Sequence, residues 1–314
     1  MFGEDGNKWY NIYIWDGESM SVKKWLNKNT KNLENKTVAI SGATGGIGKN
    51  ICEILVGLNA NLILLDRNME KSLALKKHLL EINKKVDIKN LKVDMSDFES
   101  VKAVTEELKK MNIDVLLLNA GAYKIPRKIT SIGYDNVFQI NFISPYYMIK
   151  QLLPNLREKE DSHVVVVGSV AHNYSHINEN DIDFRNNPKC TKVYGNSKRF
   201  LMFGLYELFK NEDKVKLAVS HPGITSTNIT AHYPKLLYAI IKYPMKVIFM
   251  SNKKASLSIV KGVFEGTEYH TWWGPRAFNV WGFPKKSKLK TCKKEESQKI
   301  FEISEKIYDE IIKK

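Results

Sequence analysis

The chain has 314 residues, of which 43% are hydrophobic, and its 49 Lys and Arg against 34 Asp and Glu give a formal net charge of +15. This hydrophobic content suffices for one large α/β domain or two small ones. The lysines are spread along the chain, which is typical of solvated faces, and no recognition motif or aromatic–basic interleaved patch favours a nucleic-acid partner. The three cysteines are far apart and form no Cys-x-x-Cys, so we predict neither a disulfide framework nor a metal site.

Alternating strands and helices are predicted along the chain. Strands are expected at "KTVAISG", "NLILLD", "VDIKNLKVD", "IDVLLLNAG", "HVVVVGS" and "VKLAVSHPG", and helices at "GIGKNICEILVGLN", "MEKSLALKKHLLEINKK", "DFESVKAVTEELKKM", residues 135–156 and "VYGNSKRFLMFGLYELFK". The strands are apolar without a two-residue period, as a parallel sheet covered on both faces requires. The sequence therefore predicts one doubly wound α/β domain.

The predicted domain spans residues 35–314, with a substrate lid at about 225–250 after the sixth strand and a helix at the C-terminus. Residues 1–34 are expected to be an appendage, in which "SVKKWLNKNTKNL" can form a short helix. The N-terminal residues include acids and no apolar run, unlike a signal peptide. No uninterrupted apolar run is long enough to span a bilayer. Together with the separated cysteines, this favours a reducing compartment, and we expect a cytoplasmic protein.

A glycine-rich turn, "SGATGGIG", lies between the first strand and the first helix. Gly42, Gly46 and Gly48 give the spacing G-x-x-x-G-x-G. Glycines let the backbone turn tightly and let a pyrophosphate approach the N–H groups at a helix N-terminus. The spacing is neither the standard G-x-G-x-x-G nor a P-loop, which ends in Lys-Ser or Lys-Thr. Taken alone, the pattern is also compatible with a tight turn that binds no ligand.

The end of the second strand carries a carboxylate. Asp66 lies 18 residues after Gly48, close to the spacing of about 20 that is usual for a ribose-binding acid. Such an acid accepts the ribose hydroxyls of NAD and repels the 2′-phosphate of NADP. Arg67 follows directly and could pair with that phosphate. We expect NAD to be preferred, with NADP as the alternative, and a capping or turn role as the structural alternative for Asp66.

Four Tyr-x-x-x-Lys pairs occur, and on a helix the two side chains of such a pair share a face. They are Tyr146/Lys150, Tyr194/Lys198, Tyr206/Lys210 and Tyr238/Lys242. A hydride-transferring site is expected beyond the C-terminal ends of the strands. Only Tyr194 lies in the first turns of a helix whose preceding strand ends nearby, at Ser169. We therefore predict that Tyr194, Lys198 and Ser169 form the catalytic group.

Six motifs in order resemble the short-chain dehydrogenases/reductases. They are "SGATGGIG", "LNAG", Asn141, "VVVVGS", "YGNSK" and "HPGITST", and the resemblance covers about residues 35–290. It implies a Rossmann fold and an NAD(P)-dependent oxidoreductase that acts on CH–OH groups. It also implies roles for four residues. Tyr194 would be the general acid/base, and Lys198 would lower its pKa and hold the nicotinamide ribose. Ser169 would orient the substrate oxygen, and Asn141 would hold a water that relays protons.

The resemblance further implies a cofactor groove. Asp94 would contact the adenine, Asn119 and Gly121 would line the groove, and Ile224 and Thr227 would meet the carboxamide. The full set of expected cofactor residues is Gly42, Thr44, Gly45, Gly46, Ile47, Gly48, Asp66, Arg67, Asp94, Met95, Asn119, Ala120, Gly121, Tyr194, Lys198, Pro222, Gly223, Ile224 and Thr227.

Three departures from the family pattern stand out. Ser41 replaces the usual Thr, Leu118 replaces the first Asn of N-N-A-G, and Tyr194 lies 25 positions after Ser169, roughly twice the usual gap. The inserted run "HNYSHINENDIDFRNNPKC" and the later "GPRAFNVWGFPKK" resemble the retinol dehydrogenase-like branch. That branch implies lipophilic alcohols, aldehydes and ketones as substrates.

Several alternatives stay open at this point. The apolar segment "NITAHYPKLLYAIIKYPMKVIFM" could exclude water as a lid, pack as an ordinary amphipathic helix, or make peripheral membrane contact through Lys235, Lys242 and Lys246. The resemblance implies a homodimer or homotetramer formed through the helices of Asn141 and Tyr194, with which the long C-terminal tail could interfere. A catalytically silent nucleotide-binding sensor or scaffold is the alternative to an enzyme, although all four catalytic positions are filled.

Overall fold

One eight-stranded sheet organises the computed structural model, which describes residues 19–224 and 250–313. The strand order is β3-β2-β1-β4-β5-β6-β7-β8, and every neighbouring pair is parallel except β7 and β8. The strands are β1 (Thr37–Ser41), β2 (Asn61–Asp66), β3 (Ile88–Lys92), β4 (Val115–Leu118), β5 (Ser162–Val167), β6 (Val215–Ser220), β7 (Thr271–Ala277) and β8 (Trp281–Lys288). The chain runs outward from β1 to β3 and then returns to β4, so the order reverses between β1 and β4. This confirms the predicted doubly wound fold, with its switch point at that crevice.

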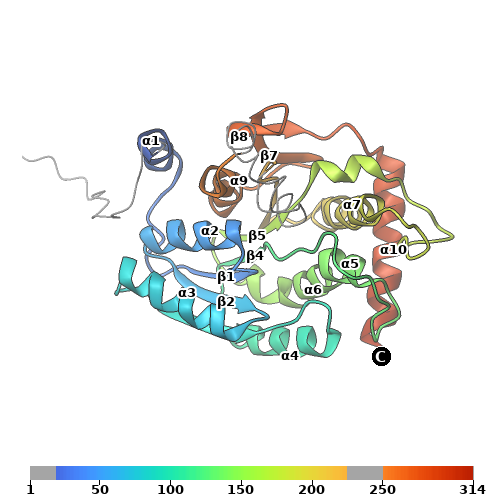
Figure 1. Cartoon of the computed structure of the whole chain (residues 1–314), viewed down its shortest axis with the longest axis horizontal. Coiled ribbons are helices and arrows are strands. Elements are labelled where there is room, and N and C mark those ends of the chain that lie inside the picture. Colours follow the sequence, from blue (N-terminus) through green and yellow to red (C-terminus); the bar gives the residue numbers. More distant parts are fainter. Residues whose placement is uncertain (1–18, 225–249, 314) are drawn as a thin grey trace, which may run out of the picture.

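Helices cover both faces of the sheet (Figure 1). The helices are α1 (Ser19–Asn29), α2 (Gly46–Gly57), α3 (Met69–Ile82), α4 (Phe98–Lys109), α5 (Asn136–Phe138), α6 (Ser144–Arg157), α7 (Cys190–Leu208), α9 (Asn252–Phe264) and α10 (Lys294–Ile312), together with the π-helix η1 (Gln139–Ile143) and the 3₁₀-helix η2 (Val170–Tyr174). One core cluster joins residues of α4, α6, α7 and α10 to the sheet, and the other joins residues of α1, α2, α3 and α9.

The two core clusters explain why the strands lack a two-residue period. Neighbouring strand residues enter opposite clusters: Ala39 lies in the first, and Val38 and Ile40 lie in the second. Both faces of a central strand are therefore buried, and both need apolar side chains. The register brings the carboxyl ends of the strands to one edge, because Ser41 pairs with Leu65 and Leu118.

The described part of the N-terminal segment forms α1, which overlaps the stretch where a helix was expected, and then leads into β1. Val22, Leu26 and Leu33 are buried in the second core cluster, so this segment packs against the domain. Residues 1–18, and the segment 225–249 that includes most of the expected lid and Thr227, lie outside the described residues.

Two strands extend the sheet beyond the sequence prediction. The "TWWGPRAF" run forms β7, which pairs with β6, and β8 returns antiparallel as a hairpin. After the hairpin, α10 packs against α7, as Figure 1 shows. No helix in the described part of the chain combines the length and the apolar character needed to cross a bilayer.

Candidate active site

The glycine-rich turn forms the connection from β1 to α2. Gly42 has a φ of +67°, and a Cβ on it would lie 3.0 Å from the Cα of Ala120. A Cβ on Gly48 would lie 2.2 Å from the carbonyl oxygen of Gly42. The turn therefore accepts no side chain at either position. Thr44, Gly45, Gly46 and Ile47 lie in this turn and at the start of α2, whose first N–H groups have no partner within the helix.

A buried carboxylate fixes this turn to the next strand. Asp66, at the end of β2, is only 3% exposed. Its Oδ1 accepts hydrogen bonds from the backbone N of Thr44 at 3.1 Å and from its Oγ1 at 2.9 Å, and its Oδ2 accepts one from the Ser72 hydroxyl at 2.9 Å. The Asn90 side chain donates to the same Ser72 oxygen at 2.8 Å. Asp66 thus takes the structural role that was the alternative and also lies at the strand end. Arg67 is exposed beside it.

Ser72 and Asn90 were not among the residues predicted from the sequence. Both lie far along the chain from the turn, and nothing in their spacing marks a contact with Asp66. Only the pairing of β2 with β3 and the position of α3 bring them together.

The residues directly after β4 are hydrogen-bonded to β1 and the glycine-rich turn. The Asn119 side chain donates to the carbonyl oxygens of Ser41 at 3.3 Å and of Gly42 at 3.0 Å. The backbone N of Ala120 donates to the Ser41 hydroxyl at 3.0 Å. The Ser that replaces the expected Thr therefore keeps a hydroxyl contact, and the loops after β1 and β4 form one rigid edge.

The loop after β3 carries Asp94 and Met95. The Oδ1 of Asp94 accepts from the backbone N of Ser96 at 2.9 Å and from its hydroxyl at 2.7 Å. The carbonyl oxygen of Met95 accepts from the Gln139 amide at 3.3 Å and the Ser144 hydroxyl at 2.8 Å. These contacts position the loop at the same edge, where the adenine was expected.

Asn141 lies in the π-helical turn η1, a local distortion that is frequent at functional sites. It is fully buried and exchanges two hydrogen bonds with Ala122, at 2.9 Å to the backbone N and 2.8 Å from the side-chain amide to the carbonyl oxygen. A Cβ on Gly121 would lie 3.0 Å from the Asn141 Oδ1 and 3.5 Å from the Lys198 Nζ. The structure therefore brings Asn141, Gly121 and Lys198 together.

Lys198 is held at the end of β5. Its Nζ donates to the carbonyl oxygen of Val167 at 2.8 Å, and the residue is 3% exposed. Desolvation by burial lowers the pKa of Lys198 to about 8. The same ammonium lies 5.8 Å from the centre of the Tyr194 ring, one helical turn earlier on α7. Tyr194 and Lys198 thus share a face, as their spacing predicts.

Ser169 and Tyr123 complete the surroundings of Tyr194. Ser169 caps η2, where its hydroxyl accepts from the backbone N of Ala171 at 3.2 Å. Burial raises the pKa of Tyr194, and a hydrogen bond with the Ser169 side chain partly opposes the rise. This direction is opposite to the lowering that the resemblance implies. The Tyr123 ring lies 5.1 Å from the Tyr194 ring. Tyr123 was not predicted as a site residue, although it directly follows "NAGA".

Two of the other Tyr-Lys pairs have structural partners. The Tyr146 hydroxyl donates to Glu305 on α10 at 2.6 Å, and the Lys150 Nζ lies 2.5 Å from the other oxygen of the same carboxylate. Tyr206 is buried and donates to the carbonyl oxygen of Thr271. The pair Tyr238/Lys242 lies outside the described residues. Among the described pairs, only Tyr194/Lys198 lies at the carboxyl edge of the sheet.

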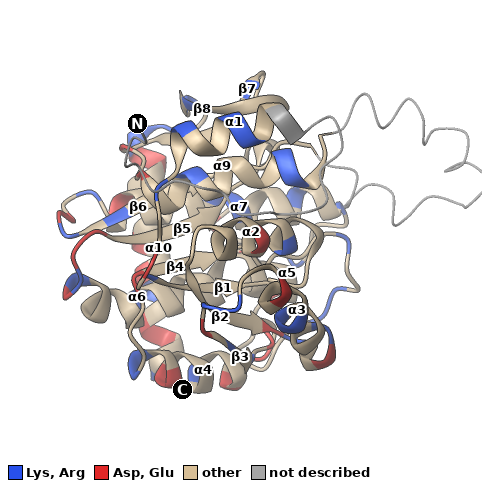
Figure 2. Cartoon of the chain, turned by 90° about the vertical axis from the view of Figure 1, so that its left-hand side faces the viewer, with Lys and Arg blue, Asp and Glu red and all other residues tan. Residues whose placement is uncertain are grey.

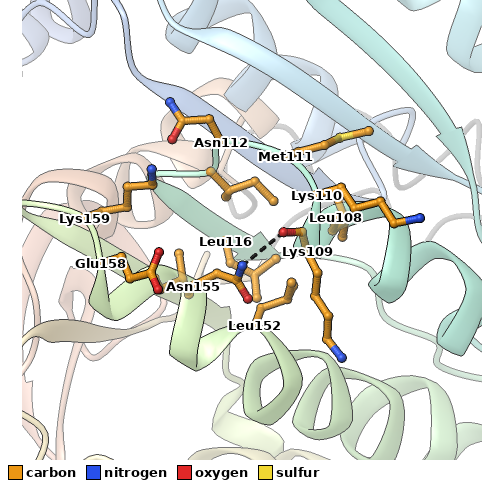
Figure 3. Close-up of a pocket in the computed structure, with 12 residues that line it drawn as sticks. Leu108, Lys109, Lys110, Met111, Asn112, Leu116, Leu152, Asn155, Glu158 and Lys159 are labelled. Carbon is orange, nitrogen blue, oxygen red and sulfur yellow. Dashed lines mark hydrogen bonds between the residues drawn. The ribbon is translucent and has the colours of Figure 1, made fainter.

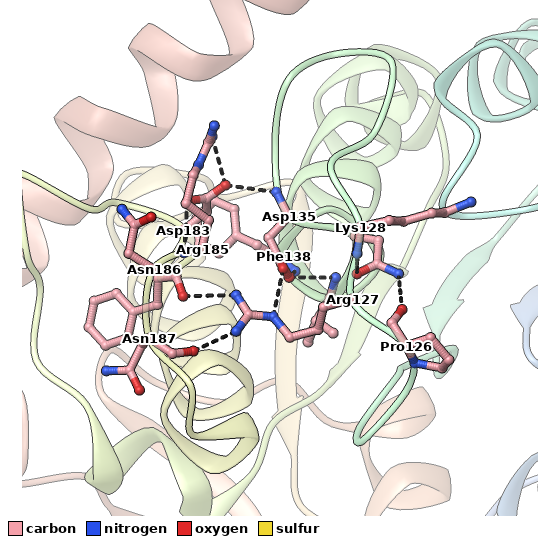
Figure 4. Close-up of polar contacts among 12 residues, drawn as sticks. Pro126, Arg127, Lys128, Asp135, Phe138, Asp183, Arg185, Asn186 and Asn187 are labelled. Carbon is pink, nitrogen blue, oxygen red and sulfur yellow. Dashed lines mark hydrogen bonds and ion pairs between the residues drawn. The ribbon is translucent and has the colours of Figure 1, made fainter.

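Arg127 anchors the inserted run between Ser169 and Tyr194 (Figure 4). The guanidinium of Arg127 binds the Asp135 carboxylate at 2.8 Å and donates to the carbonyl oxygens of Phe184 at 2.9 Å and Asn187 at 2.5 Å. The Asp183 carboxylate accepts from the backbone N of Asp135 at 2.7 Å. The insertion is thereby held beside the start of α7, and the sequence offered no sign of this contact.

The segment after β6 borders the hairpin. Gly223 has a φ of +82°, and a Cβ on it would lie 2.6 Å from the carbonyl oxygen of Val280. The backbone N of Ile224 donates to the same oxygen at 3.4 Å. Pro222, Gly223 and Ile224 therefore lie at the carboxyl end of β6, where the nicotinamide end of the groove was expected.

The buried histidines nearby have structural contacts. His172 contacts the Ser169 carbonyl oxygen at 2.6 Å and the Thr291 hydroxyl at 2.8 Å. His221 stacks on Trp272 with ring centres 4.8 Å apart. Burial lowers the pKa of each histidine to about 4, so both are neutral near pH 7.

A hollow of about 260 Å³ lies elsewhere (Figure 3). It is lined by the ends of α4 and α6 and by Leu116 near the start of β4, and the Asn155 amide donates to the carbonyl oxygen of Lys109 across it at 3.0 Å. Because the strands are parallel, the start of β4 is at the opposite edge of the sheet from Ser169. The hollow is not part of the candidate active site.

Comparisons with known proteins find a family model and curated relatives that match this chain. The family model described as short chain dehydrogenase matches residues 36–235. "Retinol dehydrogenase 13" from Homo sapiens is 28% identical over 207 residues, which cover 64% of this chain and 62% of that protein. An uncharacterized oxidoreductase from Schizosaccharomyces pombe is 29% identical over 237 residues, covering 71% of this chain and 70% of that protein. The match thus spans less than two thirds of the human relative.

Solved structures share the fold. An uncharacterized protein from Mycobacterium paratuberculosis aligns with a TM-score of 0.71 at 19% identity, covering 90% of this chain and 96% of that chain. The RhlG/NADP active-site complex from Pseudomonas aeruginosa aligns with a TM-score of 0.57 at 22% identity, covering 74% of this chain and 91% of that chain.

Proposed function

Because the chain belongs to the short chain dehydrogenase family, whose members are NAD(P)-dependent oxidoreductases, we propose that it transfers a hydride between the nicotinamide cofactor and a lipophilic alcohol, aldehyde or ketone. The single observation that carries this proposal is the placement of Lys198. Its ammonium is buried and donates to the Val167 carbonyl oxygen, and it lies close to Gly121, whose loop is held by Asn141. It also lies on the same helix face as Tyr194.

The glycine-rich turn fits a dinucleotide. Neither Gly42 nor Gly48 has room for a Cβ, and the start of α2 offers backbone N–H groups for a pyrophosphate. Gly42, Asn119 and Ala120 form one connected edge, so a cofactor would meet a surface that is already ordered. The bound nicotinamide would supply or accept the hydride.

Tyr194 is the proposed proton carrier. In the direction of reduction, its hydroxyl donates a proton to the substrate oxygen, and in the direction of oxidation the phenolate accepts one. The positive charge of Lys198 favours the phenolate. The Ser169 hydroxyl, which interacts with Tyr194 at the end of β5, hydrogen-bonds the same substrate oxygen and orients it. Asn141 fixes the π-helical turn and holds the loop that carries Gly121.

NAD is the proposed preferred cofactor. The carboxylate of Asp66 is held by Thr44 and Ser72, so it cannot swing away from a 2′-phosphate. A fixed negative charge at this position favours ribose hydroxyls over a phosphate. Arg67 is exposed. NADP would bind as tightly as NAD only if the pairing of Arg67 with the 2′-phosphate outweighed the repulsion by Asp66.

A lipophilic substrate is proposed on three grounds. The human relative is named as a retinol dehydrogenase, and the inserted run that resembles that branch is built into the structure beside Tyr194 through Arg127. Aromatic side chains border the site, with Tyr123 packed against Tyr194. These surfaces favour an apolar substrate body next to a polar reacting group.

Turnover of the purified chain tests the proposal. Primary and secondary alcohols of increasing chain length, together with retinoid and steroid alcohols, are offered with NAD⁺ and with NADP⁺, and formation of the reduced nicotinamide is followed. We expect turnover that increases with the apolar length of the substrate. Cofactor binding without turnover of any alcohol or carbonyl compound would instead favour the silent nucleotide-binding sensor.

A further inference from the structure

Three elements that pack together carry basic residues and no acidic ones. Each of α1 and α9 contains three lysines, the β7–β8 hairpin at residues 271–288 contains four Lys and Arg, and none of these segments contains Asp or Glu. Trp25 of α1 stacks on Phe283 of β8 with ring centres 6.4 Å apart. Lys254 of α9 lies 4.1 Å from the Trp281 ring and 5.1 Å from the Phe283 ring. Figure 2 shows α1 and α9 side by side, both with basic segments.

Most of these charges face solvent. Lys261 and Lys286 form ion pairs with Glu265 and Glu268. The exposed members without an ion pair to any carboxylate of the described residues are Lys23, Lys24, Lys28, Arg276, Lys285 and Lys288. Such a one-sided cluster attracts an anionic surface.

The tip of the hairpin presents an unpartnered aromatic residue. Phe278 is 95% exposed and Trp281 is 48% exposed. Phe278 and Asn279 have φ values of +52° and +57°, and the backbone N of Val280 donates to the carbonyl oxygen of Ala277 at 2.9 Å. This is a two-residue hairpin turn with both central residues left-handed, a turn that favours Asn and Gly. A Phe there is strained and buries almost nothing within the chain, so it stabilises the chain little.

We propose that this face docks on an anionic lipid bilayer, with Phe278 and Trp281 at the headgroup–acyl boundary and the exposed lysines against the lipid phosphates. We define this basic–aromatic face as the exposed Lys and Arg of α1 and the hairpin, together with Phe278 and Trp281. Basic residues combined with exposed aromatic residues match the chemistry of a membrane interface. The aromatic residues sit at a projecting turn, where they can enter lipid. Nucleic-acid binders instead offer their aromatic residues as stacking platforms within a basic groove.

The basic–aromatic face lies next to the carboxyl edge of the sheet, where the candidate active site is. Val280, in the hairpin tip, accepts the hydrogen bond from Ile224 at the carboxyl end of β6. Docking would therefore place the edge of the sheet that carries Tyr194 next to the lipid surface. A lipophilic substrate could then enter from the bilayer. The docking itself is independent of the proposed activity, whereas this delivery rests on it.

Vesicle co-sedimentation of the full chain tests the docking. We expect binding to phosphatidylcholine vesicles that contain phosphatidylserine, little binding to phosphatidylcholine alone, and loss of binding at high salt. Phe278→Asn should weaken binding by roughly tenfold. It should also raise the melting temperature, because Asn tolerates the left-handed conformation. A loss of binding with a gain in stability separates the proposal from misfolding.

A matched control lies on α3, away from the hairpin (Figure 1). Leu73 is 55% exposed and lies beside Lys76 and Lys77 at one surface. Leu73→Asn should leave vesicle binding unchanged, whereas Lys24→Gln combined with Arg276→Gln should weaken it. The proposal is overturned if vesicle binding does not depend on phosphatidylserine, or if Phe278→Asn binds the vesicles as tightly as the unmodified chain does. It is also overturned if Leu73→Asn weakens vesicle binding as much as Phe278→Asn does. It is also overturned if the face binds duplex DNA or RNA with this dependence on Phe278 and not the vesicles.

Discussion

Replacing Asp66 by Asn tests how the chain chooses between NAD and NADP. Substitution by Ala or Ser would leave the donors of Thr44 and Ser72 without their acceptor, because Asp66 accepts all three of these hydrogen bonds. Asn keeps the size of the side chain and one carbonyl acceptor, and the Ser72 hydroxyl can accept from its amide. The substitution therefore removes the charge and leaves most of the turn intact.

The expected magnitude follows from the charge that is removed. Two unit charges about 6 Å apart repel by about 1.4 to 2.8 kcal/mol if the effective dielectric constant is about 40 to 20. This energy corresponds to a factor of roughly 10 to 100 in relative specificity. Asp66 is 3% exposed, so solvent screens its charge weakly, and the upper part of this range is reasonable.

The assay is the ratio of kcat/KM with NAD to that with NADP, measured for both proteins with one substrate. We expect the ratio to fall at least ~10-fold in Asp66→Asn. Ser72→Ala should move the ratio in the same direction by less, because it loosens the carboxylate without removing its charge. Ser304→Ala is the matched control, since Ser304 is equally buried and its hydroxyl donates to the Ile300 carbonyl oxygen within α10. If the unmodified chain already favours NADP, or if Asp66→Asn leaves the ratio unchanged, Arg67 sets the preference.

Three further variants test other parts of the account. Lys198→Met should abolish turnover yet raise the free energy of unfolding at pH 7 by about 1–3 kcal/mol, because the buried ammonium is desolvated. Burial lowers the pKa of Lys198 from 10.5 to about 8. The gain in the free energy of unfolding should therefore be full below pH 8 and shrink towards pH 10.5, where the unfolded chain also loses the proton. A gain that does not change with pH in denaturation experiments would contradict this. Tyr146→Phe should keep normal kinetics and lose about 1 kcal/mol of stability through its bond to Glu305, and a large fall in kcat would count against the choice of Tyr194. Arg127→Ala should raise KM and speed proteolytic cleavage of the inserted run, and an unchanged cleavage rate would show that Arg127 does not anchor it.

The sheet could be predicted in large part from local pattern. Both faces of the central strands are buried, so the apolar runs marked the strands directly. The hairpin formed by β7 and β8 was not predicted. Its strands contain Gly and Pro, and only pairing with β6 makes them part of the sheet.

The positions of the candidate site residues were also visible in the motifs, but their contacts were not. The sequence shows four Tyr-Lys pairs of equal spacing and separates them only by their place relative to a strand end. The contacts of Tyr146 and Lys150 with Glu305 join segments far apart along the chain. The direction of the Tyr194 pKa depends on how deeply the phenol is buried, which no spacing records. The contacts of Arg127 with the inserted run likewise join segments that only the fold brings together.

Turnover of Tyr194→Phe, measured beside cofactor binding, tests the central claim most directly. Phe keeps the ring that packs against Tyr123 and removes only the hydroxyl that would carry the proton. We predict that kcat falls by at least ~100-fold, while the fluorescence of bound reduced nicotinamide gives an unchanged dissociation constant. Tyr206→Phe is the matched control, because Tyr206 lies on the same helix and bonds to Thr271. Near-normal turnover in Tyr194→Phe, or an equal loss in a stable Tyr206→Phe, would contradict the assignment of Tyr194 as the proton carrier.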